Sequence, residues 1–249
     1  MTSADTRTRP DVLGVLGGMG PWATVDFLGK LIALTPAKND TDHIPVVVSS
    51  EPHIPSRGLA AQDKQAPSPL PALLARRDFL VEAGARAISM PCNTAHYWHG
   101  EMAEGLDIPF LHIVDAVIGA LINGDHGGAK IGLIGTKATV EERLYEDPLN
   151  EQGFRCLVAD AAITADLVVP GIALVKEYRA KEAKPLLRQA VEGLLDRGAE
   201  VVILGCTELP VGLDMADSWV AERCIDPTAA LAQACVDWAM AARQKAGVN

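Results

Sequence analysis

The sequence predicts an α/β protein of two related halves, each a mainly parallel sheet flanked by helices. Short apolar runs typical of buried strands alternate with longer amphipathic runs typical of helices, and this alternation favours parallel sheets. Residues 84–94 read GARAISMPCNT, and residues 198–208 read GAEVVILGCTE. In both segments a helix-ending glycine precedes a cysteine by eight positions (92 − 84 and 206 − 198). The matched segments indicate an internal duplication.

The first half of the chain contains alternating strands and helices. In order, we expect a strand at 12–16, a helix at 22–34, a strand at 45–48, a helix at 70–83 and a strand at 87–90. Pro21 suits the first turn of the first helix. Residues 49–71 are rich in proline, serine and glycine and predict a long loop, which in a compact domain is usually functional. The last of these strands leads to Cys92 and a further helix.

The second half repeats this order. The run KIGLIGT at 130–136 mirrors the first strand and its glycine turn. The distance from the strand glycine to the cysteine is 78 residues in the first half (92 − 14) and 74 in the second (206 − 132). A helix at 182–197 carries its apolar residues on one face and ends at Gly198. These correspondences support the duplication.

The boundary between the halves is expected in residues 123–128, NGDHGG, which are typical of a linker. The last helix, at about residues 228–245, is expected to fold back onto the first half. We therefore predict a first domain of residues 1–115 plus 228–249 and a second domain of residues 116–227. The active site is expected in the cleft between them, beyond the carboxyl ends of the strands.

The composition argues against several functional classes. The chain has 249 residues, of which 49% are hydrophobic and 22% charged, as in folded soluble proteins. Its net charge of −10 argues against nucleic acid or an anionic membrane as a partner. The first ten residues lack the apolar core of a signal peptide, and no run approaches the roughly 20 apolar residues of a membrane span. We therefore expect a cytoplasmic protein.

The five cysteines are widely spaced, and in a reducing compartment they predict no disulfide framework. Cys156, Cys224 and Cys235 are expected to be small buried side chains. Cys92 and Cys206 differ, because each ends a strand and precedes an expected helix start. The N–H groups there stabilise a thiolate or hold a carboxylate.

A matched pair of thiols suits one reaction in particular. Two thiols on opposite sides of a cleft are placed to remove a proton from one face of a carbon and return one to the other. A single cysteine after a strand is usually only a buried small residue, so the prediction depends on the pair. A redox disulfide is disfavoured, because the two residues lie 114 positions apart (206 − 92).

Other polar residues offer candidate ligand contacts. Arg57 lies between prolines in the long loop, where its guanidinium suits a carboxylate; a solvated surface arginine fits the local sequence equally well. Lys176 is an anion anchor or, more commonly for such a sequence, a helix-surface lysine. The glycines of GVLGGMG at 14–20 do not form a dinucleotide fingerprint. They favour close approach of a small ligand to the backbone around Met19 and Gly20.

A metal site is not expected. His96 follows Cys92 by four positions and therefore shares its helix face, and His99 comes next. This Cys-x3-His-x2-His spacing is not a standard zinc pattern. A packed or capping histidine is the favoured interpretation.

Three motifs together resemble the aspartate/glutamate racemase family, most closely its aspartate racemase branch. They are GGMGPWAT at 17–24, MPCNTAH at 90–96 and LGCTEL at 204–209. The resemblance covers about residues 12–240, in the family's order. It implies two α/β domains in pseudo-twofold relation, an active site in their cleft and a homodimer. It also implies a racemase that uses neither pyridoxal phosphate nor metal, so no cofactor is expected.

The resemblance also implies roles for individual residues, each carried over from its motif. Cys92 and Cys206 would be the two acid/base groups. The other implied contacts are Asn93, Thr94 and Ala95 for a substrate carboxylate, Arg57 and Lys176 for substrate carboxylates, Thr207 beside the α-amino acid, and Glu208 near the second thiol. Family members often read IPDRT where this chain has IPSRG at 54–58. The loss of this Asp and Thr bears on how the side-chain carboxylate of the substrate is bound.

We therefore expect cofactor-independent racemisation of an acidic amino acid, aspartate before glutamate. The nearest alternative is a related chemistry on the same scaffold: hydantoin racemisation, malonate decarboxylation or isomerisation of a diacid. The decarboxylases are expected to need only one of the two cysteines. A non-catalytic amino-acid binding protein would show no exchange of the α-hydrogen, and a metal hydrolase would lose activity with a chelator.

Overall fold

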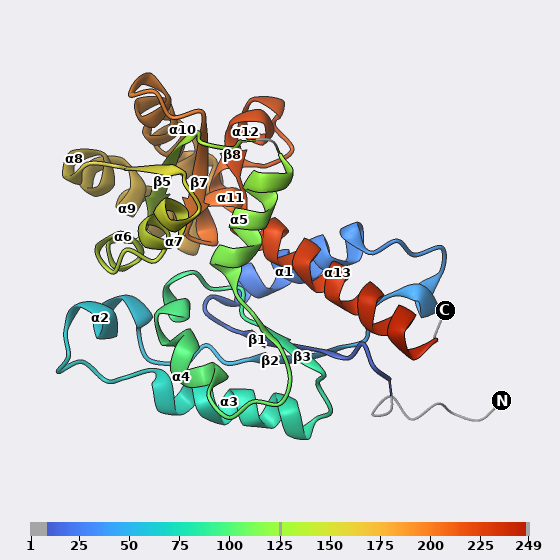
Figure 1. Ribbon diagram of the computed structural model, residues 1–249. Helices are drawn as coiled ribbons and strands as arrows, with labels where there is room; N and C mark the ends of the chain where they lie inside the picture. Colours follow the sequence, from blue (N-terminus) through green and yellow to red (C-terminus); the bar gives the residue numbers. More distant parts are fainter. Residues whose placement is uncertain (1–8, 125, 248–249) are drawn as a thin grey trace.

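Two four-stranded parallel sheets form the centres of the two halves of the molecule (Figure 1). The computed structural model describes residues 9–124 and 126–247, so residues 1–8 of the N-terminal segment and Asp125 of the predicted linker lie outside the described residues. The first sheet has the order β2 (Val46–Ser50), β1 (Leu13–Gly17), β3 (Ala87–Ser89), β4 (Phe110–Leu111). The second has the order β6 (Arg155–Val158), β5 (Lys130–Gly135), β7 (Val201–Gly205), β8 (Cys224–Ile225). The predicted fold class is confirmed.

The two sheets share their register as well as their strand order. Gly14 on β1 pairs with Ile88, and Gly132 on β5 pairs with Val202. Each partner stands four residues before the cysteine of its half (92 − 88 and 206 − 202). The duplication inferred from the sequence is therefore visible residue by residue in the pairing of the central strands.

Helices flank both sheets. The first half contains α1 (Pro21–Leu34), α2 (Arg57–Gln62), α3 (Leu70–Glu82), α4 (His99–Ala103) and α5 (Ile113–Asn123), with 3-10 turns η2 (Asp40–Asp42) and η3 (Thr94–Trp98). The remainder contains α6 (Lys137–Glu141), α7 (Glu146–Glu151), α8 (Ala161–Ile163), the π-helical turn η4 (Thr164–Val168), α9 (Val169–Lys176), α10 (Ala180–Asp196), α11 (Glu208–Leu213), α12 (Ser218–Arg223) and α13 (Pro227–Ala246).

One predicted element is wrong in part. Residues 49–71 are not a continuous loop, because α2 forms within them. Ser56 caps this helix, and its hydroxyl accepts a hydrogen bond from the Leu59 N–H at 3.3 Å. The following Leu-Ala-Ala-Gln residues are good helix formers, which the prolines and glycines around them obscured. As a result, Arg57 is the first residue of a helix.

The last helix folds back onto the first half, as predicted. In Figure 1, α13 lies beside α1, and the two helices are in contact. Arg243 of α13 donates hydrogen bonds to the carbonyls of Asp42 and His43, at 2.7 and 2.9 Å. Because α13 also contacts α5 and β7, the boundaries at residues 115 and 228 stay a prediction. None of the helices in the described ranges is both long and apolar enough to cross a membrane.

Candidate active site

The two matched cysteines line a single cavity of about 130 Å³, here called the inner chamber. Cys92 stands three residues beyond β3, and Cys206 directly follows β7. In both, the backbone N–H donates to the carbonyl two residues earlier, at 2.8 Å. The same turn therefore presents both thiols from the carboxyl ends of equivalent strands. Each residue is only 6% exposed.

The structure gathers most of the predicted site residues around this chamber. All of them except Gly20 and Ala95 line it. Gly20 lines a neighbouring cavity, and the fully buried Ala95 belongs to the same hydrophobic cluster as Cys92, to whose thiol its backbone N–H donates. Lys176 is the last residue of α9; it is exposed, as the commoner surface interpretation predicted, and it also lines the chamber.

Cys206 is held as a thiol. Its Sγ–H donates to Oε2 of Glu208 at 2.9 Å, and the Thr207 hydroxyl donates to the same oxygen at 3.3 Å. Burial raises the pKa of the Cys206 thiol well above its usual range, and the negative charge of Glu208 raises it further, against an opposing effect of Lys176. Cys206 is therefore arranged to give a proton.

Cys92 has a different electrostatic environment. Burial raises the pKa of its thiol too, but the positive charge of Arg57 opposes this rise, as does the backbone N–H of Ala95. The charge of Glu208 raises the pKa of Cys92 as well, so Arg57 is the main neighbour that favours its thiolate. A thiol beside a cation is suited to act as a base.

Two buried donors at the inner chamber lack an acceptor within the described chain. Arg57 donates through Nη1 to the carbonyls of Ile54 and Pro55, at 3.0 and 3.2 Å, while its Nε is without a partner. Nδ2 of Asn93 is also buried and without a partner. A buried donor without a partner costs about 1–3 kcal/mol, and a ligand carboxylate supplies the missing acceptors.

The orientation of the Asn93 amide is set from the other half of the molecule. The fully buried Tyr145, just before α7, donates its hydroxyl proton to Oδ1 of Asn93. With Oδ1 occupied, Nδ2 is the amide atom that remains for a ligand.

Replacing Tyr145 by phenylalanine is expected to lower the kcat/KM of a reaction catalysed in the inner chamber about five- to tenfold, because a buried hydrogen bond contributes about 1 kcal/mol. A double-mutant cycle tests whether the hydroxyl acts through Asn93. The Tyr145→Phe effect should vanish in an Asn93→Ala background. Equal effects in both backgrounds would show that Tyr145 acts by another route. Tyr97→Phe, on a half-exposed ring away from the chamber, is the matched control.

The sequence interpretation missed several lining residues, among them Thr136. Its hydroxyl lies 3.1 Å from that of Thr94 and 2.9 Å from that of Thr139, so it joins the two halves at the chamber wall. A signal for it was present, because Thr136 ends the KIGLIGT run that mirrors the first strand. Tyr145, which contacts Asn93 rather than lining the chamber, had no such signal in the sequence.

His96 packs beneath the site, as the favoured interpretation predicted. Its Nδ1 lies 2.8 Å from the carbonyl oxygen of Cys92, and its Nε2 accepts the Ile113 N–H at 3.1 Å. These two bonds fix the neutral tautomer with hydrogen on Nδ1. Among the residues described, no group of three or more potential ligands is arranged to hold a metal ion.

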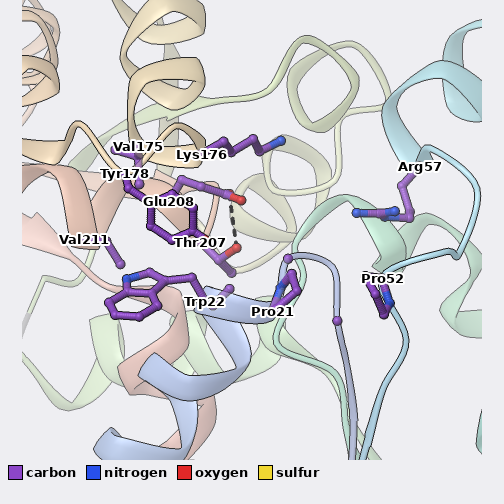
Figure 2. A pocket seen from close by; sticks show the side chains of 13 residues that line it. Pro21, Trp22, Pro52, Arg57, Val175, Lys176, Tyr178, Thr207, Glu208 and Val211 are labelled. Atoms are coloured by element: carbon purple, nitrogen blue, oxygen red, sulfur yellow. Dashed lines mark hydrogen bonds between the residues drawn. The ribbon is translucent and has the colours of Figure 1, made fainter.

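A second cavity, of about 270 Å³ and here called the outer chamber, adjoins the first (Figure 2). The two share Arg57, Lys176, Thr207 and Glu208. In Figure 2, Arg57 and Lys176 extend toward the space between them, and Trp22 stands on the side opposite Arg57. The backbone at Gly18 has φ +92°, and a methyl group there would lie 2.3 Å from the Glu51 nitrogen, so this turn requires glycine.

Comparison with known proteins agrees with this geometry. Residues 16–235 match the model of the Asp/Glu/hydantoin racemase family. The chain belongs to this family. The broad specificity amino-acid racemase RacX of Bacillus subtilis (strain 168) is 29% identical over 231 residues, which are 90% of this chain and 96% of that protein. Family membership and this relative support an amino-acid racemase.

Solved structures of the family have the same fold. The aspartate racemase of Picrophilus torridus superimposes with a TM-score of 0.81 and 31% identity, over 92% of this chain and 94% of that one. An aspartate racemase homologue from Pyrococcus horikoshii OT3 gives a TM-score of 0.74 over 92% of this chain and 99% of that one. At 22% identity, the second likeness concerns the fold alone.

Proposed function

We propose that the protein racemises an acidic amino acid, aspartate in preference to glutamate, with Cys92 and Cys206 as the two acid/base groups. One observation carries the proposal: two thiols from equivalent strands line one small chamber, one beside a cation and the other donating to a carboxylate. Such a pair supplies a base and an acid at the same time.

The reaction follows from these environments. The Cys92 thiolate takes the α-proton, so that the Cα–H bond breaks, an S–H bond forms and the electron pair remains on Cα and its carboxylate. The Cys206 thiol then gives its proton to the opposite face. The roles reverse for the other enantiomer. One proton is taken from the substrate and one is returned to it. The composition and the oxidation state of the substrate are therefore unchanged, and the reaction needs no redox partner.

The carbanionic intermediate needs stabilisation, because an α-hydrogen is a very weak acid. Arg57, Lys176 and the Asn93 amide line the chamber with hydrogen-bond donors, and a carboxylate accepts hydrogen bonds from such groups. Fixed donors in a site shielded from water stabilise developing negative charge more strongly than water does. Two cations beside a small chamber also favour a short diacid, which supports aspartate. The names of the relatives, an aspartate racemase and a broad specificity amino-acid racemase, support an amino-acid substrate.

Incubation with L-aspartate in heavy water tests the proposal. From the first turnovers, the D-aspartate formed should carry deuterium at Cα, while the remaining L-aspartate stays largely unlabelled. A chelator and a carbonyl reagent that traps pyridoxal phosphate should leave the rate unchanged. Absence of α-hydrogen exchange with every amino acid in a panel of both enantiomers would refute the proposal and favour a binding protein.

The rate should increase with pH from neutrality to beyond about 8.5, the ordinary pKa of a thiol. Burial raises the pKa of the Cys92 thiol, so at neutral pH the thiolate is the minority form, and its fraction grows about tenfold per pH unit below the pKa. The rising limb of kcat/KM against pH measures this ionisation. Burial and the charge of Glu208 raise the pKa of the Cys206 thiol well above its usual range, so Cys206 remains a proton donor over the same range. A profile that is flat or falls with pH would contradict this assignment.

The homodimer implied by the family resemblance belongs to the same proposal. Light scattering on the purified protein measures the molar mass directly. A mass of one chain, 26.4 kDa, would exclude the dimer, whereas twice that mass would support it.

A further inference from the structure

The outer chamber has a different chemistry from the inner one. Besides the residues that the two cavities share, its lining is mostly apolar and includes Trp22, Val175, Tyr178, Val211 and two prolines. Its volume is about twice that of the inner chamber, 270 against 130 Å³. An aspartate bound between the cysteines, with its carboxylates on the donors of the inner chamber, leaves this second space unused.

An aromatic pair from both halves of the molecule forms one wall of the outer chamber. Trp22 belongs to α1, and Tyr178 lies in the turn between α9 and α10; their rings meet edge to face at 6.3 Å. Although these are large apolar groups, Trp22 is 55% exposed and Tyr178 82% exposed. Figure 2 shows Trp22 at the side of the pocket away from Arg57 and Pro52. Solvent-exposed aromatic rings beside a cavity are ready to bury apolar surface of a ligand.

The backbone at Tyr178 is unusual. Its φ is +62°, in the left-handed region that bulky side chains rarely adopt. The turn is held by the Tyr178 N–H, which donates to the Val175 carbonyl at 3.0 Å. Lys176 lies in the same turn and faces both chambers. Residues kept in such conformations cluster at functional sites, because the surrounding structure must offset their cost.

The order of the lining residues orients a substrate. Asn93, Thr94 and Thr136 line only the inner chamber, Arg57 and Lys176 line both, and the aromatic pair lines only the outer one. An amino acid whose α-carboxylate meets Asn93 and Thr94 therefore directs its side chain past the two cations and toward Trp22. A side chain longer than that of aspartate reaches the apolar wall.

We propose that the outer chamber is a side-chain pocket through which the enzyme also accepts amino acids with uncharged aromatic or long aliphatic side chains, such as phenylalanine and methionine, and that Trp22 and Tyr178 determine this specificity. The inference rests on the proposed racemisation at Cys92 and Cys206 and extends its substrate class. The apolar side chain fills the outer chamber, while the α-carbon occupies the same position between the thiols as in aspartate.

The test compares three substrates in heavy water: L-aspartate, L-methionine and L-phenylalanine. Mass spectrometry follows α-deuterium, and chiral chromatography follows inversion. The wild-type protein should label and invert all three. In Trp22→Ala and in Tyr178→Gly, the ratio of kcat/KM for phenylalanine to that for aspartate should fall by about tenfold, the range expected for lost apolar contacts in a pocket. Glycine at position 178 removes the ring and accepts the positive φ.

The outcomes separate the inference from the function on which it rests. Exchange of aspartate alone would overturn the inference and leave the racemase proposal intact, whereas no exchange of any amino acid would overturn both. An unchanged phenylalanine-to-aspartate ratio in both variants would also overturn the inference. Phe79→Ala removes a half-exposed ring on α3, outside both chambers, and should leave the ratio unchanged. Thermal melting of each variant verifies that it is folded.

Discussion

Racemisation is expected to be lost when either Cys92 or Cys206 is replaced by alanine, with kcat/KM lower by about 10²- to 10⁴-fold, the contribution of a positioned proton-transfer group. Each variant keeps one thiol in the chamber but has nothing to act on the opposite face of Cα. Because the equilibrium constant between enantiomers is one, kcat/KM must fall equally in both directions. Chiral chromatography from each pure enantiomer measures both.

Isotope exchange should separate the roles of the two cysteines. In each variant the surviving cysteine still removes a proton from the enantiomer whose hydrogen faces it, and returns a solvent deuteron to the same face. One enantiomer therefore gains deuterium without inverting, and the other does not. Cys92→Ala and Cys206→Ala should label opposite enantiomers. This complementary pattern follows only if the two thiols lie on opposite faces of Cα.

The control for this experiment is a thiol outside the chamber. Cys156 lies on β6, and burial raises its pKa to about 12, so it remains protonated at neutral pH. Cys156→Ala should racemise at the wild-type rate. Full activity in either Cys92→Ala or Cys206→Ala, or labelling of the same enantiomer in both, would exclude the two-base mechanism.

The fold was predictable from the sequence because its signals are local and repeated. The glycine-strand-cysteine pattern occurs twice with equal spacing, and the structure pairs Gly14 with Ile88 as it pairs Gly132 with Val202. Buried parallel strands are also nearly continuous apolar runs, which are easy to recognise. The short helix at Arg57 was missed because its proline- and glycine-rich surroundings weakened the helical pattern.

The candidate site was predictable only where a motif carried it. The contacts that set the electrostatic environment of the site join residues far apart in the sequence. Arg57 acts on Cys92 from 35 positions away (92 − 57), and Tyr145, in the other half of the chain, donates a hydrogen bond to Asn93. The aromatic wall of the outer chamber was not predictable: Trp22 lies in the GGMGPWAT motif, but Tyr178 lies 156 positions further along the chain (178 − 22) and belongs to no motif. These side chains come together only because the two halves of the folded chain pack against each other.

Replacing Arg57 by alanine should lower kcat/KM by about 10²-fold or more, the loss expected when a donor to developing negative charge is removed from a shielded site. Arg57 lines both chambers, its Nε is buried without an acceptor in the described chain, and its charge lowers the pKa of Cys92. The variant therefore loses a carboxylate contact and a source of thiolate stabilisation at once. Steady-state kinetics across pH measures both effects.

The pH profile distinguishes these two contributions. Without the positive charge, the pKa of Cys92 rises further, so the rising limb of kcat/KM should move to higher pH. Arg57→Lys keeps a charge but not the planar fork, so it should restore the position of the limb more fully than the rate. Arg197→Ala, on a surface arginine that pairs with Asp160, should change neither. If Arg57→Ala slows the reaction without moving the limb, Arg57 acts on the substrate alone, and Cys92 must be ionised by another group.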